Sequence, residues 1–99
     1  MNLAVELWGK KAAAEKGKAK LTNDDELFNK AIGSYGKYIE VGGAEVEPEA
    51  NYSIGECYLY LRNAEEGKNY LEKVRISGDD TWSAKAEALM EANGLLDIE

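Results

Sequence analysis

Apolar residues recur at helical spacing in five segments of this chain, and the alternation of apolar and polar residues that marks strands is absent. Proline occurs once, and the ten glycines are spread along the sequence instead of gathering into a linker. With 99 residues the chain can bury one hydrophobic core, whereas two cores of half that size would each be marginal. The sequence therefore predicts a single all-α domain over residues 1–99.

The first two predicted helices form one hairpin. The first covers roughly residues 2–20 and carries the apolar residues Leu3, Ala4, Leu7, Trp8, Ala12 and Ala19. Thr22, with Asp25 three residues later, has the spacing of a capping box and predicts the start of the second helix. The buried stripe of that helix is expected to comprise Leu27, Phe28, Ala31, Ile32, Tyr35, Tyr38 and Ile39. Gly42 and Gly43 predict its end, because glycine readily adopts a left-handed cap.

Three more helices follow, each with its own start signal. Pro48 suits the first turn of the third, Asn63 is expected to cap the fourth, and Asp79 or Asp80 opens the fifth. The buried faces of the fourth and fifth are expected to comprise Gly67, Tyr70, Leu71, Val74, Trp82, Ala86, Leu89 and Met90. Asn93 and Gly94 stop the fifth helix, and Leu95 or Leu96 is expected to fold back over its end. Helices of about 14–19 residues joined by short turns suit antiparallel hairpins stacked side by side.

The residue types that are absent exclude several kinds of active site. The chain has no histidine, which excludes Ser/His and Cys/His nucleophiles and the ordinary zinc sites. Cys57 is the one cysteine, so an internal disulfide is excluded as well. The pairs Asp24–Asp25 and Asp79–Asp80 stand at predicted helix starts, where carboxylates cap N–H groups. We therefore expect no catalytic residues, metal or cofactor, and interpret the chain as a protein that is not an enzyme.

The net charge of −7 is unevenly distributed, with +3 on residues 1–23 and −10 on residues 24–99. An acidic body makes nucleic acid an unlikely partner, because binding the phosphate backbone requires neutralising it. The five lysines between positions 10 and 20 allow a local anion site, but a solvated helix end is the favoured interpretation. No apolar run approaches the roughly 20 residues that span a bilayer, so we expect no membrane association. The N-terminal segment also lacks the charge order of a secretory signal, and the expected location is cytoplasmic.

Residues 48–81 span 34 positions and resemble one tetratricopeptide (TPR) repeat. The matching positions combine a large apolar residue, small residues and aromatic or leucine residues at the family's spacing: Ile54, Gly55, Tyr58, Gly67, Leu71 and Val74. Two positions depart from the pattern, because Asp79 replaces the usual closing proline and Val74 is larger than the usual alanine. One repeat is thus well matched.

A looser match to the same family lies upstream. Ala31 and Tyr35 fit the small and aromatic positions of a second helix, and Trp8 and Ala12 fit the helix before it. The connection is longer than usual, and Tyr38 stands where alanine is common. The resemblance implies a right-handed superhelical array of stacked hairpins, with the fifth helix as a C-terminal cap.

Gly55 and Cys57 place small residues inside the third helix. The core side of this helix is expected to comprise Ala50, Ile54, Cys57, Tyr58 and Leu61. Gly55 is predicted to let a neighbouring helix approach closely, a gain that outweighs a helix-propensity cost of about 1 kcal/mol. Cys57 is expected to be a small buried hydrophobe.

The other side of the third helix is the predicted partner-binding face, with Glu49, Tyr52, Glu56, Tyr60 and Asn63. The resemblance implies that these positions line a concave groove that holds a peptide or helical segment. Tyrosine is common at binding hot spots, and glutamates between tyrosines favour a basic or amide-rich partner. The alternative interpretation is a half-buried Tyr/Glu face packed on the first hairpin.

Two functions follow from these features. The first is a soluble, non-catalytic protein–protein interaction module or scaffold. The second is a structural or self-assembly module, either a homo-oligomer or a fragment of a longer repeat array, because the ends of such arrays must be polar or covered.

Overall fold

The computed structural model describes residues 2–96, which form five α-helices and contain no strand. The elements are α1 (Leu3–Thr22), α2 (Asp25–Gly42), the 3-10 turn η1 (Gly43–Glu45), α3 (Glu47–Tyr60), α4 (Ala64–Arg75) and α5 (Asp80–Ala92). The all-α prediction is confirmed over these residues. The first helix is longer than expected at 20 residues, and α4 and α5 are shorter at 12 and 13.

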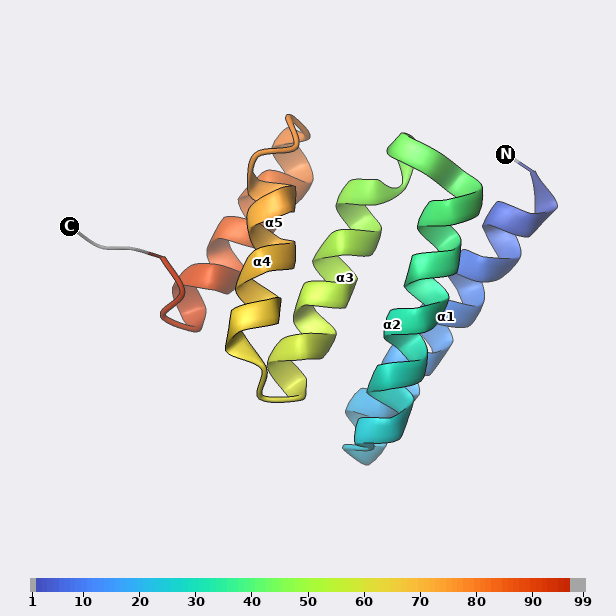
Figure 1. Ribbon diagram of the computed structural model, residues 1–99, viewed down its shortest axis with the longest axis horizontal. Helices are drawn as coiled ribbons and strands as arrows, with labels where there is room; N and C mark the ends of the chain where they lie inside the picture. Colours follow the sequence, from blue (N-terminus) through green and yellow to red (C-terminus); the bar gives the residue numbers. More distant parts are fainter. Residues whose placement is uncertain (1, 97–99) are drawn as a thin grey trace.

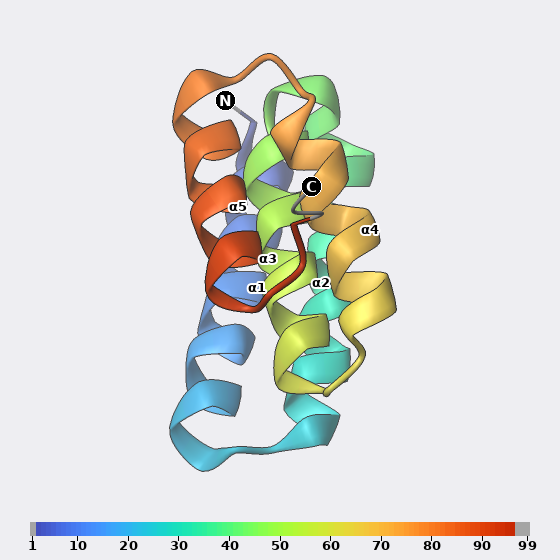
Figure 2. The same cartoon turned by 90° about the vertical axis from the view of Figure 1, so that its left-hand side faces the viewer.

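Each helix packs against its neighbours in the chain, so the molecule is a stack of hairpins (Figure 1). Viewed end-on, α1 and α5 lie on one side of the stack and α2 and α4 on the other, with α3 between them (Figure 2). The principal extents of 45 × 32 × 17 Å describe a flattened body. No helix within residues 2–96 has the length and apolar character needed to cross a bilayer. The stacking leaves α3 with two different faces, one toward α1 and α5 and one toward α2 and α4.

The hydrophobic core consists of two clusters. The larger joins α1, α2 and α3 and contains Val5, Ala12, Ala19, Phe28, Ala31, Tyr35, Tyr38, Val46, Ala50, Ile54 and Cys57. The smaller joins α4 and α5 and contains Leu71, Val74, Ala86 and Met90. Every other member of the predicted α2 stripe is partly buried against the larger cluster, and Ser34 is also buried on α2. The predicted core faces of α2, α4 and α5 are therefore confirmed.

The predicted apolar face of α1 is confirmed in part: Ala12 and Ala19 are fully buried and Trp8 is partly buried against the larger cluster, but the two leucines are not buried. Leu3 and Leu7 are 69% and 57% exposed, whereas Val5 is only 6% exposed. Helix α1 is the end helix and packs closely on α2, so a narrow stripe of small residues suffices for its contact. The approach is tight at Gly9, where a Cβ atom would lie 2.9 Å from the Tyr38 ring. Leucine side chains outside that stripe stay in solvent.

The capping box predicted at Thr22 and Asp25 is wrong. Asp24 is the N-cap of α2, and its carboxylate accepts a hydrogen bond from the Glu26 N–H at 2.9 Å. Thr22 belongs to α1, and its hydroxyl donates to the Lys18 carbonyl at 2.8 Å. A carboxylate caps better than a hydroxyl here, because its negative charge also complements the positive end of the helix dipole.

The start signals of the other helices are confirmed. Pro48 lies in the first turn of α3. The Asn63 side chain accepts a hydrogen bond from the Glu66 N–H at 3.1 Å and caps α4. Asp79, and not Asp80, caps α5 by accepting from the Trp82 N–H at 3.1 Å.

The end of α5 is the Schellman motif that the sequence predicts. Gly94 has a φ of 67°, and its N–H donates to the Glu91 carbonyl at 3.1 Å. The Leu95 N–H donates to the Met90 carbonyl at 2.8 Å, and the Leu95 side chain packs on the smaller cluster. These bonds satisfy carbonyls that the helix itself leaves unpaired.

Helix α3 ends in the same motif, but with Arg62 at the position that Gly94 occupies after α5. The Arg62 N–H donates to the Leu59 carbonyl and the Asn63 N–H to the Tyr58 carbonyl, at 3.0 and 2.9 Å. Arg62 has a φ of 60°, a left-handed conformation that costs an L-residue about 1 kcal/mol relative to glycine. This turn is therefore strained.

We expect Arg62→Gly to raise the free energy of unfolding by about 1 kcal/mol, because glycine adopts this φ without strain. Urea denaturation followed by circular dichroism measures the change. Arg62→Ala is the matched control, since it removes the side chain but keeps the strained Cβ. An equal gain in both variants would mean that the arginine side chain, and not the backbone, is the source of the cost.

Candidate functional site

The five residues predicted to bind a partner lie along α3 and just beyond it, and the two at the ends of the row have other contacts. Glu49 is exposed, and its carboxylate accepts a hydrogen bond from the Tyr38 hydroxyl at 3.0 Å. Asn63 is used as the cap of α4. The central three, Tyr52, Glu56 and Tyr60, share one face of α3 and form the centre of the candidate site.

Glu56 is paired with two lysines of α1. Its carboxylate contacts the ammonium groups of Lys16 and of Lys20, the latter at 3.5 Å. The Lys16 and Glu56 side chains are 17% and 16% exposed, so this pair is largely screened from solvent. The negative charge of Glu56 raises the pKa of Lys20 more than burial lowers it. The lysine segment is therefore not a purely solvated helix end, because two of its side chains reach across to α3.

Each tyrosine of the site is held by another aromatic ring and lies near a lysine. The Tyr52 and Trp82 ring centroids are 5.4 Å apart with the rings tilted, and the Lys16 ammonium lies 6.0 Å from the Tyr52 centroid. Burial is the main cause that raises the pKa of Tyr52.

Tyr60 stacks on Phe28 of α2, with centroids 4.9 Å apart and an interplanar angle of 11°. The Lys20 ammonium lies 5.7 Å from the Tyr60 centroid. Tyr60 nevertheless remains 42% exposed, so one part of a large side chain is fixed and another part faces solvent. Such a half-buried aromatic ring is pre-positioned for contact.

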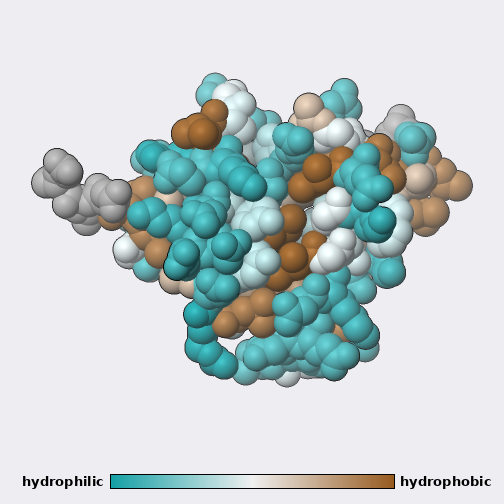
Figure 3. Space-filling view, viewed as in Figure 1, coloured by the Kyte–Doolittle hydropathy of each residue, from teal (hydrophilic) through white to brown (hydrophobic). Residues whose placement is uncertain are grey.

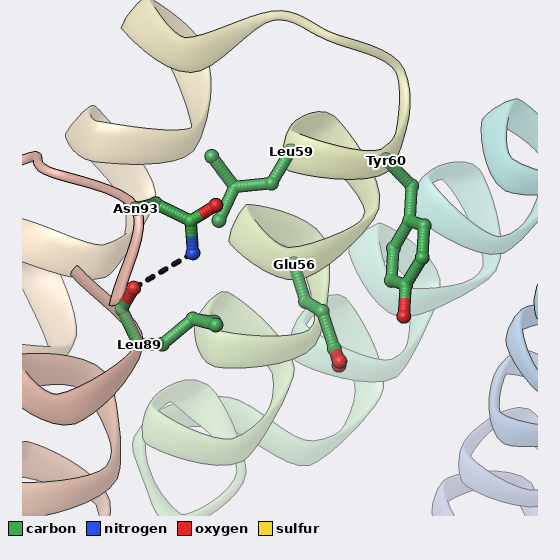
Figure 4. Close-up of a pocket in the computed structure, with 5 residues that line it drawn as sticks. All are labelled: Glu56, Leu59, Tyr60, Leu89 and Asn93. Atoms are coloured by element: carbon green, nitrogen blue, oxygen red, sulfur yellow. Dashed lines mark hydrogen bonds between the residues drawn. The ribbon is translucent and has the colours of Figure 1, made fainter. Parts of the chain in front are cut away.

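A pocket of about 280 Å³ lies between α3 and the C-terminal end of α5 (Figure 4). Its lining consists of Glu56, Leu59 and Tyr60 from α3 and of Leu89 and Asn93 from α5 and its cap. The Asn93 side-chain nitrogen donates to the Leu89 carbonyl at 2.8 Å, which orients the amide. We call the pocket and the adjoining face of α3 the α3 groove, whose walls are α1 and α5. Its residues are Lys16, Lys20, Tyr52, Glu56, Leu59, Tyr60, Trp82, Leu89 and Asn93.

The walls of the α3 groove were missed from the sequence. Lys16 and Lys20 are one helical turn apart, which places them on one side of α1, but nothing in that spacing indicates which helix they reach. Trp82 and Leu89 fall on the predicted buried side of α5, where they are partly buried. Their position beside α3 follows from the packing of α5 on α4 and could not be read from α5 alone.

The opposite face of α3 carries a strip of apolar side chains between α2 and α4 (Figure 3). Ile39, Ile54 and Tyr70 line a hollow there, and the Tyr58 and Tyr70 rings stack with centroids 5.6 Å apart. Tyr58 and Tyr70 thus form a second aromatic pair on the far side of the same helix. They supply a matched control for the tyrosines of the α3 groove.

Cys57 is fully buried within the larger cluster, as predicted. Burial raises the pKa of its thiol to about 12, and the neighbouring charge of Glu56 adds to the shift while Lys16 and Lys20 oppose it. A thiol with this pKa stays protonated near neutral pH, and the thiolate is the nucleophilic form. Cys57 therefore acts as a packing residue in this conformation.

The α3 groove combines three kinds of contact: apolar pocket walls, aromatic edges and charged groups that are already paired. It can bury an apolar side chain beside Leu59 and Leu89 and offer polar contacts through Asn93 and through Lys20, whose side chain is 40% exposed. Comparison with protein-family models, with curated proteins and with solved structures finds no significant match to this chain.

Proposed function

We propose that this chain is a non-catalytic protein–protein interaction module, a TPR-like array whose α3 groove docks a peptide or helical segment of a partner. The observation that carries the proposal is the pocket beside Tyr60, where a partly exposed aromatic ring adjoins Leu59 and Leu89 between two helices. A rigid aromatic ring next to a pocket is the usual arrangement of a binding hot spot.

The close crossing of α3 and α4 supports the TPR-like part of the proposal. Gly55 and Gly67 face each other there, because a Cβ on either residue would lie within 3.3 Å of the other's carbonyl oxygen. Leu71 and Leu59 fill the space beside the two glycines. Small residues at this crossing are what the resemblance implies for a repeat whose two helices pack tightly.

A peptide-display library tests the docking proposal. Peptides selected on the wild-type protein should bind Tyr52→Ala/Tyr60→Ala at least about tenfold more weakly, because both rings border the groove. The matched control is Tyr58→Ala/Tyr70→Ala, which removes a stacked tyrosine pair from the opposite face of α3. Circular dichroism on both variants checks that the helices are retained.

Two results would contradict this proposal. Equal weakening by the two double variants would mean that the tyrosines act through stability alone. If only the Tyr58→Ala/Tyr70→Ala variant binds the peptides more weakly, docking would instead take place on the apolar strip between α2 and α4.

The second candidate function is self-assembly, which the exposure of Leu3 and Leu7 favours. These leucines lie one turn apart on α1, the end helix of the stack, and present apolar surface to solvent. Light-scattering mass across a concentration series distinguishes the two functions. An oligomer that Leu3→Gln/Leu7→Gln converts to a monomer would support assembly through the end of the stack and leave the α3 groove free.

A further inference from the structure

The charges around the α3 groove differ in sign from the charge of the whole chain. The chain carries −7, yet Glu56 is faced by the ammonium groups of both Lys16 and Lys20. On the other wall the Lys85 ammonium lies 4.4 Å from the centroid of the Trp82 ring. Three lysines therefore border the groove around a carboxylate that is already paired.

The pairing of Glu56 removes the reason to expect a basic partner. A cationic side chain would have to displace Lys16 or Lys20 from the carboxylate before it could bind there. It would also meet lysines near the faces of Tyr52, Tyr60 and Trp82, where cation–π contacts would otherwise form. Like charges brought together at an interface oppose binding.

An anionic partner meets the opposite situation. The Lys20 side chain is 40% exposed and its ammonium has three donors, of which Glu56 takes one at 3.5 Å. Lys85 is exposed on α5, one turn from the pocket residue Leu89. A carboxylate can approach either lysine without breaking the Lys16–Glu56 pair.

The pocket supplies the second element of recognition. Leu59, Leu89 and Tyr60 line a volume of about 280 Å³ together with Asn93 and the lysine-paired Glu56 (Figure 4). Burying one large apolar side chain there contributes affinity, and the amide of Asn93 lies at the same pocket for a polar contact with the ligand backbone.

We propose that the α3 groove selects an acidic peptide segment that carries a large apolar side chain, with the carboxylates at Lys20 and Lys85 and the apolar side chain in the pocket. This inference rests on the proposed function and names the chemistry of its partner. It replaces the basic or amide-rich partner that the spacing of glutamates and tyrosines on α3 favours in the sequence.

Three fluorescent peptides of equal length test the partner's charge. Each carries one leucine pair, and the flanking residues are glutamate, glutamine or lysine. We expect the glutamate peptide to bind at least about tenfold more tightly than the lysine peptide at low ionic strength, with the preference shrinking as salt is added.

Charge-reversal variants locate the interaction. Lys20→Glu/Lys85→Glu should abolish the preference for the glutamate peptide, whereas Lys18→Glu/Lys30→Glu makes the same change in net charge on exposed lysines of α1 and α2 and should retain it. Loss of the preference in both variants would overturn the inference, because it would show that the peptide responds to the net charge of the protein and not to the groove.

The failure of this inference and that of the proposed function give different results. A preference for the lysine or glutamine peptide that depends on Tyr52 and Tyr60 overturns the acidic partner but keeps the docking groove. If none of the three peptides binds but library peptides bind and need the groove, the acidic partner is likewise overturned and the docking groove is kept. No binding of either kind overturns both. Binding of a single-stranded oligonucleotide in place of the glutamate peptide overturns the peptide assignment, since phosphates can also pair with these lysines.

Discussion

Phe28→Ala is expected to lower the free energy of unfolding by about 3–5 kcal/mol, which is a large part of the total stability of a small domain. Phe28 is fully buried, and its ring stacks on Tyr60 of α3. The substitution removes a large side chain from the cluster that joins α1, α2 and α3, and the surrounding helices can close the cavity only in part. The contact between the first hairpin and α3 is therefore expected to weaken most.

Urea denaturation of Phe28→Ala and of Leu21→Ala measures this effect. Leu21 is 90% exposed, so its truncation should change stability by no more than about 0.5 kcal/mol. Phe28→Leu keeps most of the buried volume but loses the stacking with Tyr60. Its loss in free energy of unfolding should lie between those of Phe28→Ala and Leu21→Ala. A loss in Phe28→Ala as small as that in Leu21→Ala would show that α2 does not pack on α3 through this ring.

Gly55→Ala is expected to destabilise the protein by roughly 1–3 kcal/mol, although alanine is the better helix former. A Cβ at this position would lie 2.9 Å from Cγ of Leu71 and 3.2 Å from the carbonyl oxygen of Gly67. Leu71 is fully buried and the carbonyl belongs to the α4 backbone, so neither can yield without moving α4. The steric cost is expected to exceed the gain of about 1 kcal/mol in helix propensity.

A glycine-to-alanine substitution elsewhere in the chain should change stability in the opposite direction. Gly36 lies inside α2, and a Cβ there would meet no atom within 4 Å, so Gly36→Ala should raise stability by up to about 1 kcal/mol. Equal stabilisation of both alanine variants would contradict the close crossing of α3 and α4.

A double variant identifies the group that causes the strain. Leu71→Ala alone is expected to cost about 2–5 kcal/mol, because it leaves a cavity at a fully buried position. Gly55→Ala/Leu71→Ala should cost less than the two single changes together, since the new methyl group occupies space that the leucine has left. Additive losses would instead assign the strain to the Gly67 carbonyl.

Local signals predicted the helices well because they act within one turn of the chain. Asn63, Asp79 and Gly94 set helix ends through bonds to residues no more than five positions away, so their roles could be read from spacing. The failure at Thr22 has the same local origin. Thr22, Asn23 and Asp24 all carry side chains that can cap a helix, and in the structure the carboxylate of Asp24 caps α2.

Periodicity predicted burial where a helix is covered on one broad face and failed where it is not. Helix α2 packs on both α1 and α3, and its predicted stripe is buried or partly buried. Helix α1 packs closely on α2 alone. Leu3 and Leu7 therefore stay exposed, although both are apolar and lie one helical turn apart. Which neighbours a helix has is not encoded in its own apolar pattern.

Short-range preferences, which the chain carries in every conformation, determine its helical secondary structure, the helix caps and the two different faces of α3. The α3 groove does not follow from them, because its members come from α1, α3 and α5, and the contact between Lys20 and Glu56 joins residues 36 positions apart. The ion pairs that neutralise Glu56 form only after the hairpins stack. Packing therefore decides both the walls of the site and the sign of its charge, since a charge acts on a ligand only together with the charges that folding places beside it.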